Sequence, residues 1–90
     1  MSNISAIKTL VAAEKYDEAA KIIDEQLAIE PRNADLLYLR GRLWWRSGDR
    51  YRAMSCYSRA VAIDSNSPAA IALEHARQIE AFFNPDLLNP

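Results

Sequence analysis

The sequence matches itself at an offset of 34 residues, and this repeat limits the possible folds more than any other feature. When the 90-residue chain is shifted by 34, small and apolar positions coincide, which pairs Ala19 with Ala53, Ala28 with Ala62, Ile29 with Ile63, Leu27 with Val61 and Ile23 with Tyr57. A fixed period of this length is typical of arrays in which each unit is one pair of packed elements. We therefore expect stacked, similar units.

The matching segments have the apolar spacing of helices. Residues 17–29 carry apolar side chains at Ala19, Ile22, Ile23, Leu27 and Ile29. Residues 50–63 repeat the pattern at Ala53, Met54, Tyr57, Ala60, Val61 and Ile63. These spacings follow a helical period and not an alternating one. The small residues Ala19 and Ala53 suit points where two antiparallel helices cross closely.

Proline, glycine and capping residues divide the chain into five helices. Pro31 ends one helix, because the residue before a proline avoids the helical region. Asn33 suits an N-cap, and Gly48 suits a left-handed helix end. Ser67 and Pro68 open the last helix as cap and first-turn proline, and Pro85 follows its end. The predicted helices cover residues 3–13, 16–30, 34–47, 50–63 and 68–83.

A family pattern is visible in the central segment. The residues of this segment that stand at the positions of the pattern are Leu37, Arg40, Gly41, Trp44, Gly48, Asp49, Ala53, Tyr57 and Ala60. This segment resembles the tetratricopeptide repeat, and Tyr16, Ala19, Ile23 and Pro31 look like a weaker copy of it. Three departures are Arg40 in place of the usual Leu, Ser65 in place of the closing proline, and His75 at the place that Gly41 holds one repeat earlier.

The resemblance implies an all-α fold, a right-handed α-α superhelix of two antiparallel helix pairs plus a C-terminal capping helix. It divides a single domain, 1–90, into a repeat over 1–33, a repeat over 34–67, a capping helix over 68–84 and a tail over 85–90. The ending FFNPDLLNP also resembles the tails of short stand-alone proteins of this family from bacteria.

The net charge of −1 conceals an uneven distribution along the chain. Residues 34–67 carry six Arg and three Asp, a balance of +3, whereas residues 1–33 and 68–90 each have a balance of −2. A nucleic-acid-binding domain is usually basic overall, so this total argues against such a role. The outer-facing arginines Arg50, Arg52 and Arg59 are expected to be exposed convex surface.

Catalytic and metal-binding signals are weak. Cys56 and His75 are the lone residues of their types, and they fall on different predicted helices, so they do not suggest a nucleophile and its base. We expect a non-enzyme without cofactor or metal. A lone cysteine and the lack of a long apolar run favour a cytoplasmic protein without a membrane span. We interpret the first residues as a helix and not as a secretion signal.

The third predicted helix carries the candidate binding residues. Tyr38, Arg42, Trp45 and Arg46 follow helical spacing and form one stripe, whereas Trp44 falls on the repeat's packing stripe and is expected in the core. In the resembling family, the first helix of each pair lines a concave groove that holds ligand peptides. Carried over by position, the groove residues are Lys8, Tyr38, Arg42, Trp45, Arg46, Ala69, Ala72, Ala76 and Ile79. Arginine with Tyr and Trp suits an extended protein segment that has acidic groups.

Two alternatives remain open at this stage. Trp45 either faces the groove or packs against the fifth helix near Ile79, and the arginines of the stripe either face a ligand or pair with Asp35, Asp49 or Glu80. The apolar tail residues Phe82, Phe83, Leu87 and Leu88 either seal the last helix or form an edge for self-association. The alternative function is therefore a structural, self-associating protein, and the expected state is a monomer or weak homodimer.

Overall fold

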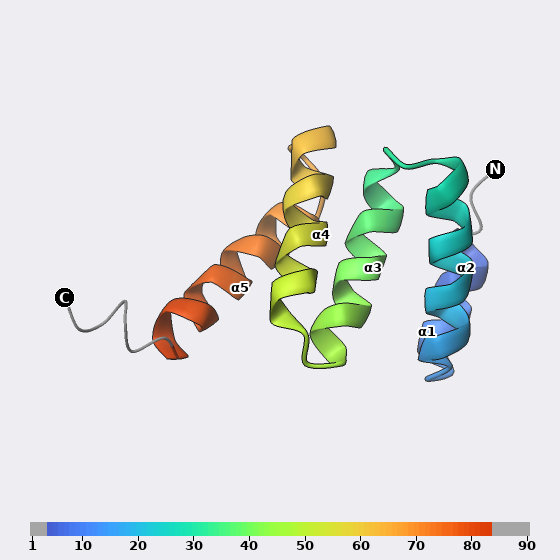
Figure 1. Cartoon of the computed structure of the whole chain (residues 1–90), viewed down its shortest axis with the longest axis horizontal. Coiled ribbons are helices and arrows are strands. Elements are labelled where there is room, and N and C mark those ends of the chain that lie inside the picture. The colour runs from blue at the N-terminus through green and yellow to red at the C-terminus, as the bar shows by residue number, and fades with distance from the viewer. Residues whose placement is uncertain (1–3, 84–90) are drawn as a thin grey trace.

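The computed structural model describes residues 4–83, with Phe82 and Phe83 as backbone only. Within this range the protein is all-helical, as predicted. The five helices are α1 (Ile4–Ala12), α2 (Tyr16–Ile29), α3 (Ala34–Arg46), α4 (Arg50–Ile63) and α5 (Ala69–Phe83). Each predicted boundary lies within one residue of the observed one. Consecutive helices pack against one another, so the chain forms a row of helices from α1 to α5 (Figure 1).

Local signals account for the helix ends. The side chain of Asn33 caps α3 by accepting a hydrogen bond of 3.1 Å from the amide three residues on, and Asp49 caps α4 in the same way at 3.0 Å. Ser67 Oγ accepts a bond of 3.1 Å from the amide that opens α5. Gly48 has φ +92°, the left-handed conformation predicted for the end of α3.

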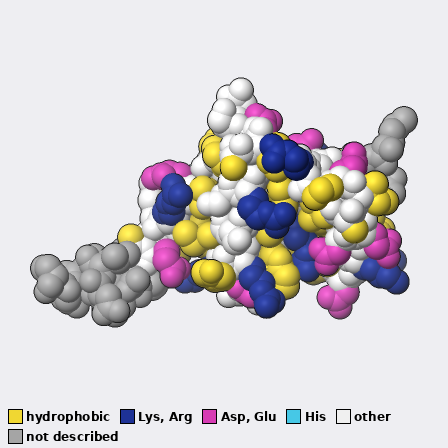
Figure 2. Space-filling model, turned by 45° about the horizontal axis from the view of Figure 1, so that its top comes forward, with side chains coloured by type: hydrophobic (Ala, Val, Ile, Leu, Met, Phe, Trp, Pro, Cys, Tyr) yellow, Lys and Arg dark blue, Asp and Glu magenta, His cyan; other side chains and the backbone are white. Residues whose placement is uncertain are grey.

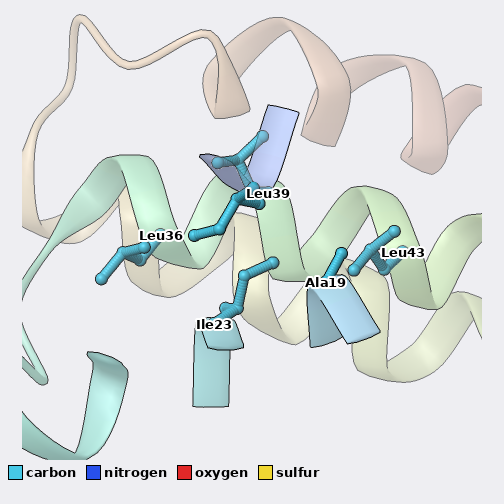
Figure 3. Close-up of a cluster of buried hydrophobic side chains, with 6 residues drawn as sticks. Ala19, Ile23, Leu36, Leu39 and Leu43 are labelled. Atoms are coloured by element: carbon cyan, nitrogen blue, oxygen red, sulfur yellow. The ribbon is translucent and has the colours of Figure 1, made fainter. Parts of the chain in front are cut away.

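Two clusters of buried side chains hold the helices together. The first cluster joins α1, α2 and α3 through Ile7, Ala19, Ile23, Leu36, Leu39 and Leu43. In Figure 3, Ala19 and Ile23 of α2 point toward Leu39 and Leu43 of α3. Ile7 and Ile23 have no exposed surface, and burial of such a side chain is worth about 1.5–3 kcal/mol. This cluster therefore fixes α1 and α2 against α3.

The second cluster continues the core from α3 through α4 to α5. It contains Leu37, Ala53, Tyr57, Ala60, Ala69 and Leu73. Gly41 makes the contact between α3 and α4 possible, because a Cβ at this position would lie 2.5 Å from Tyr57 Cε1 and 2.7 Å from Tyr57 Cδ1. The glycine of the family pattern is thus required by the close approach of an aromatic ring.

A polar cluster joins α2, α3 and α4 on the side away from α1 and α5, and we call it the outer cluster. Arg40 pairs with Asp24 through bonds of 2.8 and 3.2 Å, and its guanidinium lies 4.1 Å from the ring centre of Trp44. Arg52 lies 4.8 Å from the same ring centre and pairs with Asp49 at 3.6 Å. Trp44 packs against the second cluster, as its place on the packing stripe predicts, but it is only half-buried, and Arg40 and Arg52 lie over its ring.

Candidate peptide-binding groove

Three neighbouring hollows are lined by residues of α1, α3, α4 and α5. The first hollow, of about 330 Å³, is lined by Ile4, Lys8, Asp35, Tyr38, Leu39, Arg42 and Pro68. The second, of about 210 Å³, is lined by Val11, Arg42, Trp45, Arg46 and Tyr57. The third, of about 230 Å³, is lined by Trp45, Tyr57, Ala72, His75, Ala76 and Ile79. Neighbouring hollows share residues, so together they form one groove.

The candidate residues from the sequence lie along this groove. Lys8 and Tyr38 line the first hollow, and Arg42 lies between the first and the second. Arg46 lines the second hollow, while Ile79 lines the third. Ala72 and Ala76 also line the third hollow, whereas Ala69 is fully buried in the second cluster.

Sequence reasoning missed several groove residues, above all Tyr57. This tyrosine belongs to α4 and occupies a packing position of the repeat, yet it lines both the second and the third hollow. It reaches them across Gly41, where no side chain stands in the way. The glycine at position 41 was the signal in the sequence that could have indicated this role of Tyr57. Val11 and His75 were missed as well, because nothing in their local sequence distinguishes them.

Trp45 combines the two alternatives that the sequence left open. Its side chain is partly buried and packs on the second cluster, and it also lines the second and third hollows, opposite Ile79 of α5. The guanidinium of Arg50 lies 5.5 Å from its ring centre. Trp45 is therefore a wall of the groove that is held in place by core contacts.

The groove arginines lie over tyrosine rings and have no acidic partner among the residues that the structure describes. Arg42 lies 5.8 Å from the ring centre of Tyr38, and Arg46 lies 4.5 Å from that of Tyr16. Both side chains are exposed. Of the two alternatives that the sequence left open for Arg42 and Arg46, pairing with Asp35, Asp49 or Glu80 is not found in the described part of the chain, where the ion pairs seen involve Arg40 and Arg52 of the outer cluster.

Tyr57, the buried tyrosine that lines the second and third hollows, is uncharged at neutral pH. Tyr57 is 4% exposed, and burial, with a smaller contribution from neighbouring Tyr38, raises its pKa from 10.0 to about 12. Arg42 opposes this shift only in part. Around neutral pH, Tyr57 is thus a neutral wall, and the charges beside it in the second hollow are those of the arginines.

Basic and acidic side chains occupy different regions of the surface. Figure 2 shows Lys and Arg side chains over the middle of one face, among hydrophobic atoms, with many of the Asp and Glu side chains toward the two sides. The middle corresponds to α3 and α4, whose sequence has the positive balance. The uneven distribution of charge along the sequence therefore corresponds to an uneven distribution of charge over the protein surface.

The remaining chemical groups are dispersed. Between residues 4 and 83, no group of three or more His, Cys, Asp or Glu residues is placed to hold a metal ion. Cys56 is buried in α4, and burial raises the pKa of its thiol. His75 is exposed on α5. No helix in the described range is long and apolar enough to cross a bilayer.

Comparison with known proteins identifies the family. The sequence model of the tetratricopeptide repeat matches residues 10–76, and the chain therefore belongs to the tetratricopeptide repeat family. A similar protein is the "DnaJ homolog subfamily C member 7 homolog" of Schizosaccharomyces pombe, which is 31% identical over 65 residues. The match covers 71% of this chain but only 14% of that protein. Repeats of this family generally mediate interactions between proteins.

Proposed function

We propose that this protein is a peptide-binding adaptor or scaffold module whose ligand lies in the groove formed by α1, α3 and α5. The proposed contact residues are Lys8, Tyr38, Arg42, Trp45, Arg46 and Ile79. The observation that carries the proposal is the continuity of the three hollows, which share Arg42, Trp45 and Tyr57. A continuous groove with separate hollows suits an extended chain that presents one side chain to each.

The charge of the groove favours a ligand with acidic groups. Arg42 and Arg46 are exposed and have no acidic partner among residues 4–83, so their guanidinium groups can bind carboxylates. The proposal includes a non-catalytic role without cofactor, a cytoplasmic location, and a division into repeats 1–33 and 34–67 with a capping helix over 68–84 and a tail over 85–90.

Selection from a random-peptide library tests the proposal. Peptides enriched on the wild-type protein are expected to bind Arg46→Glu about tenfold more weakly, because the charge reversal places a carboxylate in the second hollow. Arg59→Glu is the matched control, since Arg59 is exposed on α4 and lines none of the three hollows. Circular dichroism should show equal helicity and melting for both variants. Equal binding by the two variants, or no enrichment at all, would contradict the proposal.

Self-association is the second candidate function, and exposed apolar side chains favour it. Ile29, Tyr51 and Ile71 are 75%, 84% and 66% exposed. The side chains of Phe82, Phe83, Leu87 and Leu88, which the sequence suggested as a lid or a sticky edge, lie outside the described part of the structure. Sedimentation velocity across the micromolar range separates the two functions. A strict monomer throughout that range counts against assembly, and a concentration-dependent dimer that Ile71→Lys disrupts supports it.

A further inference from the structure

The second and third hollows share a wall but differ in chemistry. Trp45 and Tyr57 belong to both. On one side of this wall, the second hollow is lined by the basic residues Arg42 and Arg46. On the other side, the third hollow is bordered by small and branched apolar side chains of α5, with His75 as its one polar side chain besides the shared ring groups. A ligand that fills both hollows must therefore present two different kinds of side chain next to each other.

The charges around the second hollow select the sign of one of these side chains. No acidic residue of the described chain lines the second or the third hollow. The nearest acids in neighbouring hollows are Asp35, beside Lys8 and Arg42, and Asp17, beside Arg46 and Tyr16. Neither forms an ion pair with these arginines. The two cations are thus available to a ligand carboxylate, and Arg can bind it through two parallel hydrogen bonds.

We propose that the groove recognises an extended peptide in which a bulky apolar residue lies two positions from Asp or Glu. The apolar side chain enters the third hollow against Trp45, Ala76 and Ile79, and the carboxylate pairs with Arg42 and Arg46 in the second. This inference rests on the proposed function, because it assigns the ligand chemistry of the same groove. It goes further in fixing a sequence pattern that other peptides would not satisfy.

The spacing follows from the geometry of an extended chain. Residues two apart project to the same side, about 6.6 Å apart along the chain, and are therefore the closest pair of side chains that can enter two neighbouring hollows. Adjacent residues would project to opposite sides, so only one of them could enter the groove. The third hollow, at about 230 Å³, has room for one large side chain.

The test uses the peptides enriched from the random library and synthetic variants of them. Enriched peptides should carry Leu, Ile, Met, Phe or Trp two positions from Asp or Glu. Replacement of the acid by Lys, or of the apolar residue by Gly, should weaken binding to the wild-type protein about tenfold. The Lys peptide should regain affinity for Arg46→Glu, and such a charge exchange cannot be explained by a structural role of Arg46.

The third hollow is tested separately through α5. Ile79→Lys should weaken binding of the same peptides about tenfold by placing a charge in the apolar hollow, whereas Arg77→Glu, an exposed change on α5 that lines none of the hollows, should not. Groove-dependent peptides that lack the acid-and-apolar pair, or that tolerate Ile79→Lys, would overturn this inference while leaving peptide binding intact. If no enriched peptide is sensitive to Arg46→Glu, the proposed function and this inference fail together.

Discussion

Helix α3 uses the same residue type in two different ways on its two sides. Arg40 belongs to the outer cluster, where its side chain is only 14% exposed, pairs with Asp24 and lies over the ring of Trp44. Arg42, two residues on, is exposed in the groove, stacks on Tyr38 and has no acidic partner among residues 4–83. A shift of two residues on a helix moves a side chain to nearly the opposite face, so the position of each arginine decides whether it is satisfied internally.

The comparison separates arginines that hold the repeats together from arginines that are open to a ligand. Arg40 replaces the Leu of the family pattern, yet it performs a comparable packing task, because its pair with Asp24 connects α2 to α3 and its stack on Trp44 extends toward α4. A surface salt bridge alone is worth little, but a bidentate pair stacked on an aromatic ring is worth more. The arginines of the outer cluster are therefore held by contacts within the protein, whereas Arg42 and Arg46 have no acidic partner among residues 4–83, as the proposed binding role requires.

The largest expected effect is a loss of stability from a change at Gly41, where α3 and α4 are in close contact. Gly41→Ala places a Cβ within 2.5 Å of the Tyr57 ring, so either the ring or α4 must move. We expect a loss of about 2–3 kcal/mol in the free energy of unfolding, or roughly a 10 °C fall in Tm. Thermal unfolding followed by circular dichroism measures this change.

Two further variants identify the cause of the Gly41→Ala loss. Gly48→Ala should cost less, about 1 kcal/mol, because its strain is confined to a positive φ and no atom lies within 4 Å of the new Cβ. Adding Tyr57→Leu to Gly41→Ala should cost less than the sum of the two single changes, since the obstructing ring is gone. Strict additivity would show that the contact between Gly41 and Tyr57 is not the reason.

A smaller effect should separate Arg40 from Arg42. Arg40→Ala is expected to lower the free energy of unfolding by about 1–2 kcal/mol, because it removes an ion pair and a stacked guanidinium together. Arg42→Ala should change it by less than about 0.5 kcal/mol, as is usual for an exposed side chain without a buried partner. Urea denaturation of both variants gives the values. A double-mutant cycle with Asp24→Ala then isolates the pair, and zero coupling would mean that packing on Trp44 carries the whole effect.

The features that the sequence predicted correctly are those encoded locally. Helix ends follow from Pro31, Gly48 and the caps Asn33 and Ser67, each of which acts within a few residues. The repeat offset then determines which helix faces pack, because equivalent positions hold small or apolar residues. This information was sufficient for the all-α fold, whereas the binding role of Tyr38, Arg42, Trp45 and Arg46 on α3 stays a prediction.

The outer cluster was not predictable, because its parts come from three helices and are not repeated. The positions equivalent to Arg40 in the neighbouring units hold Ala6 and Glu74, so the 34-residue period gives no sign of a partner for it. Asp24 reaches Arg40 only after α2 and α3 have packed. Tyr57 illustrates the same difficulty in the groove. Its place in the repeat predicts a packing residue, but it also lines the candidate site, and only its close contact with Gly41 in the folded protein reveals this.

The smallest expected effect is a pH dependence of stability that distinguishes the buried Tyr57 from the exposed Tyr51. In the unfolded chain Tyr57 loses its proton near pH 10.0, but in the folded protein its raised pKa delays this loss to about 12. Between these values the unfolded state binds fewer protons, so the stability contributed by the neutral tyrosine is complete below pH 10 and is lost as the pH rises toward 12. Tyr57→Phe removes this term, and its Tm should fall less steeply than that of the wild type across this window. Tyr51→Phe, at an 84% exposed position on α4, should follow the wild type, and a parallel decline of all three proteins would show that Tyr57 is not shielded from solvent.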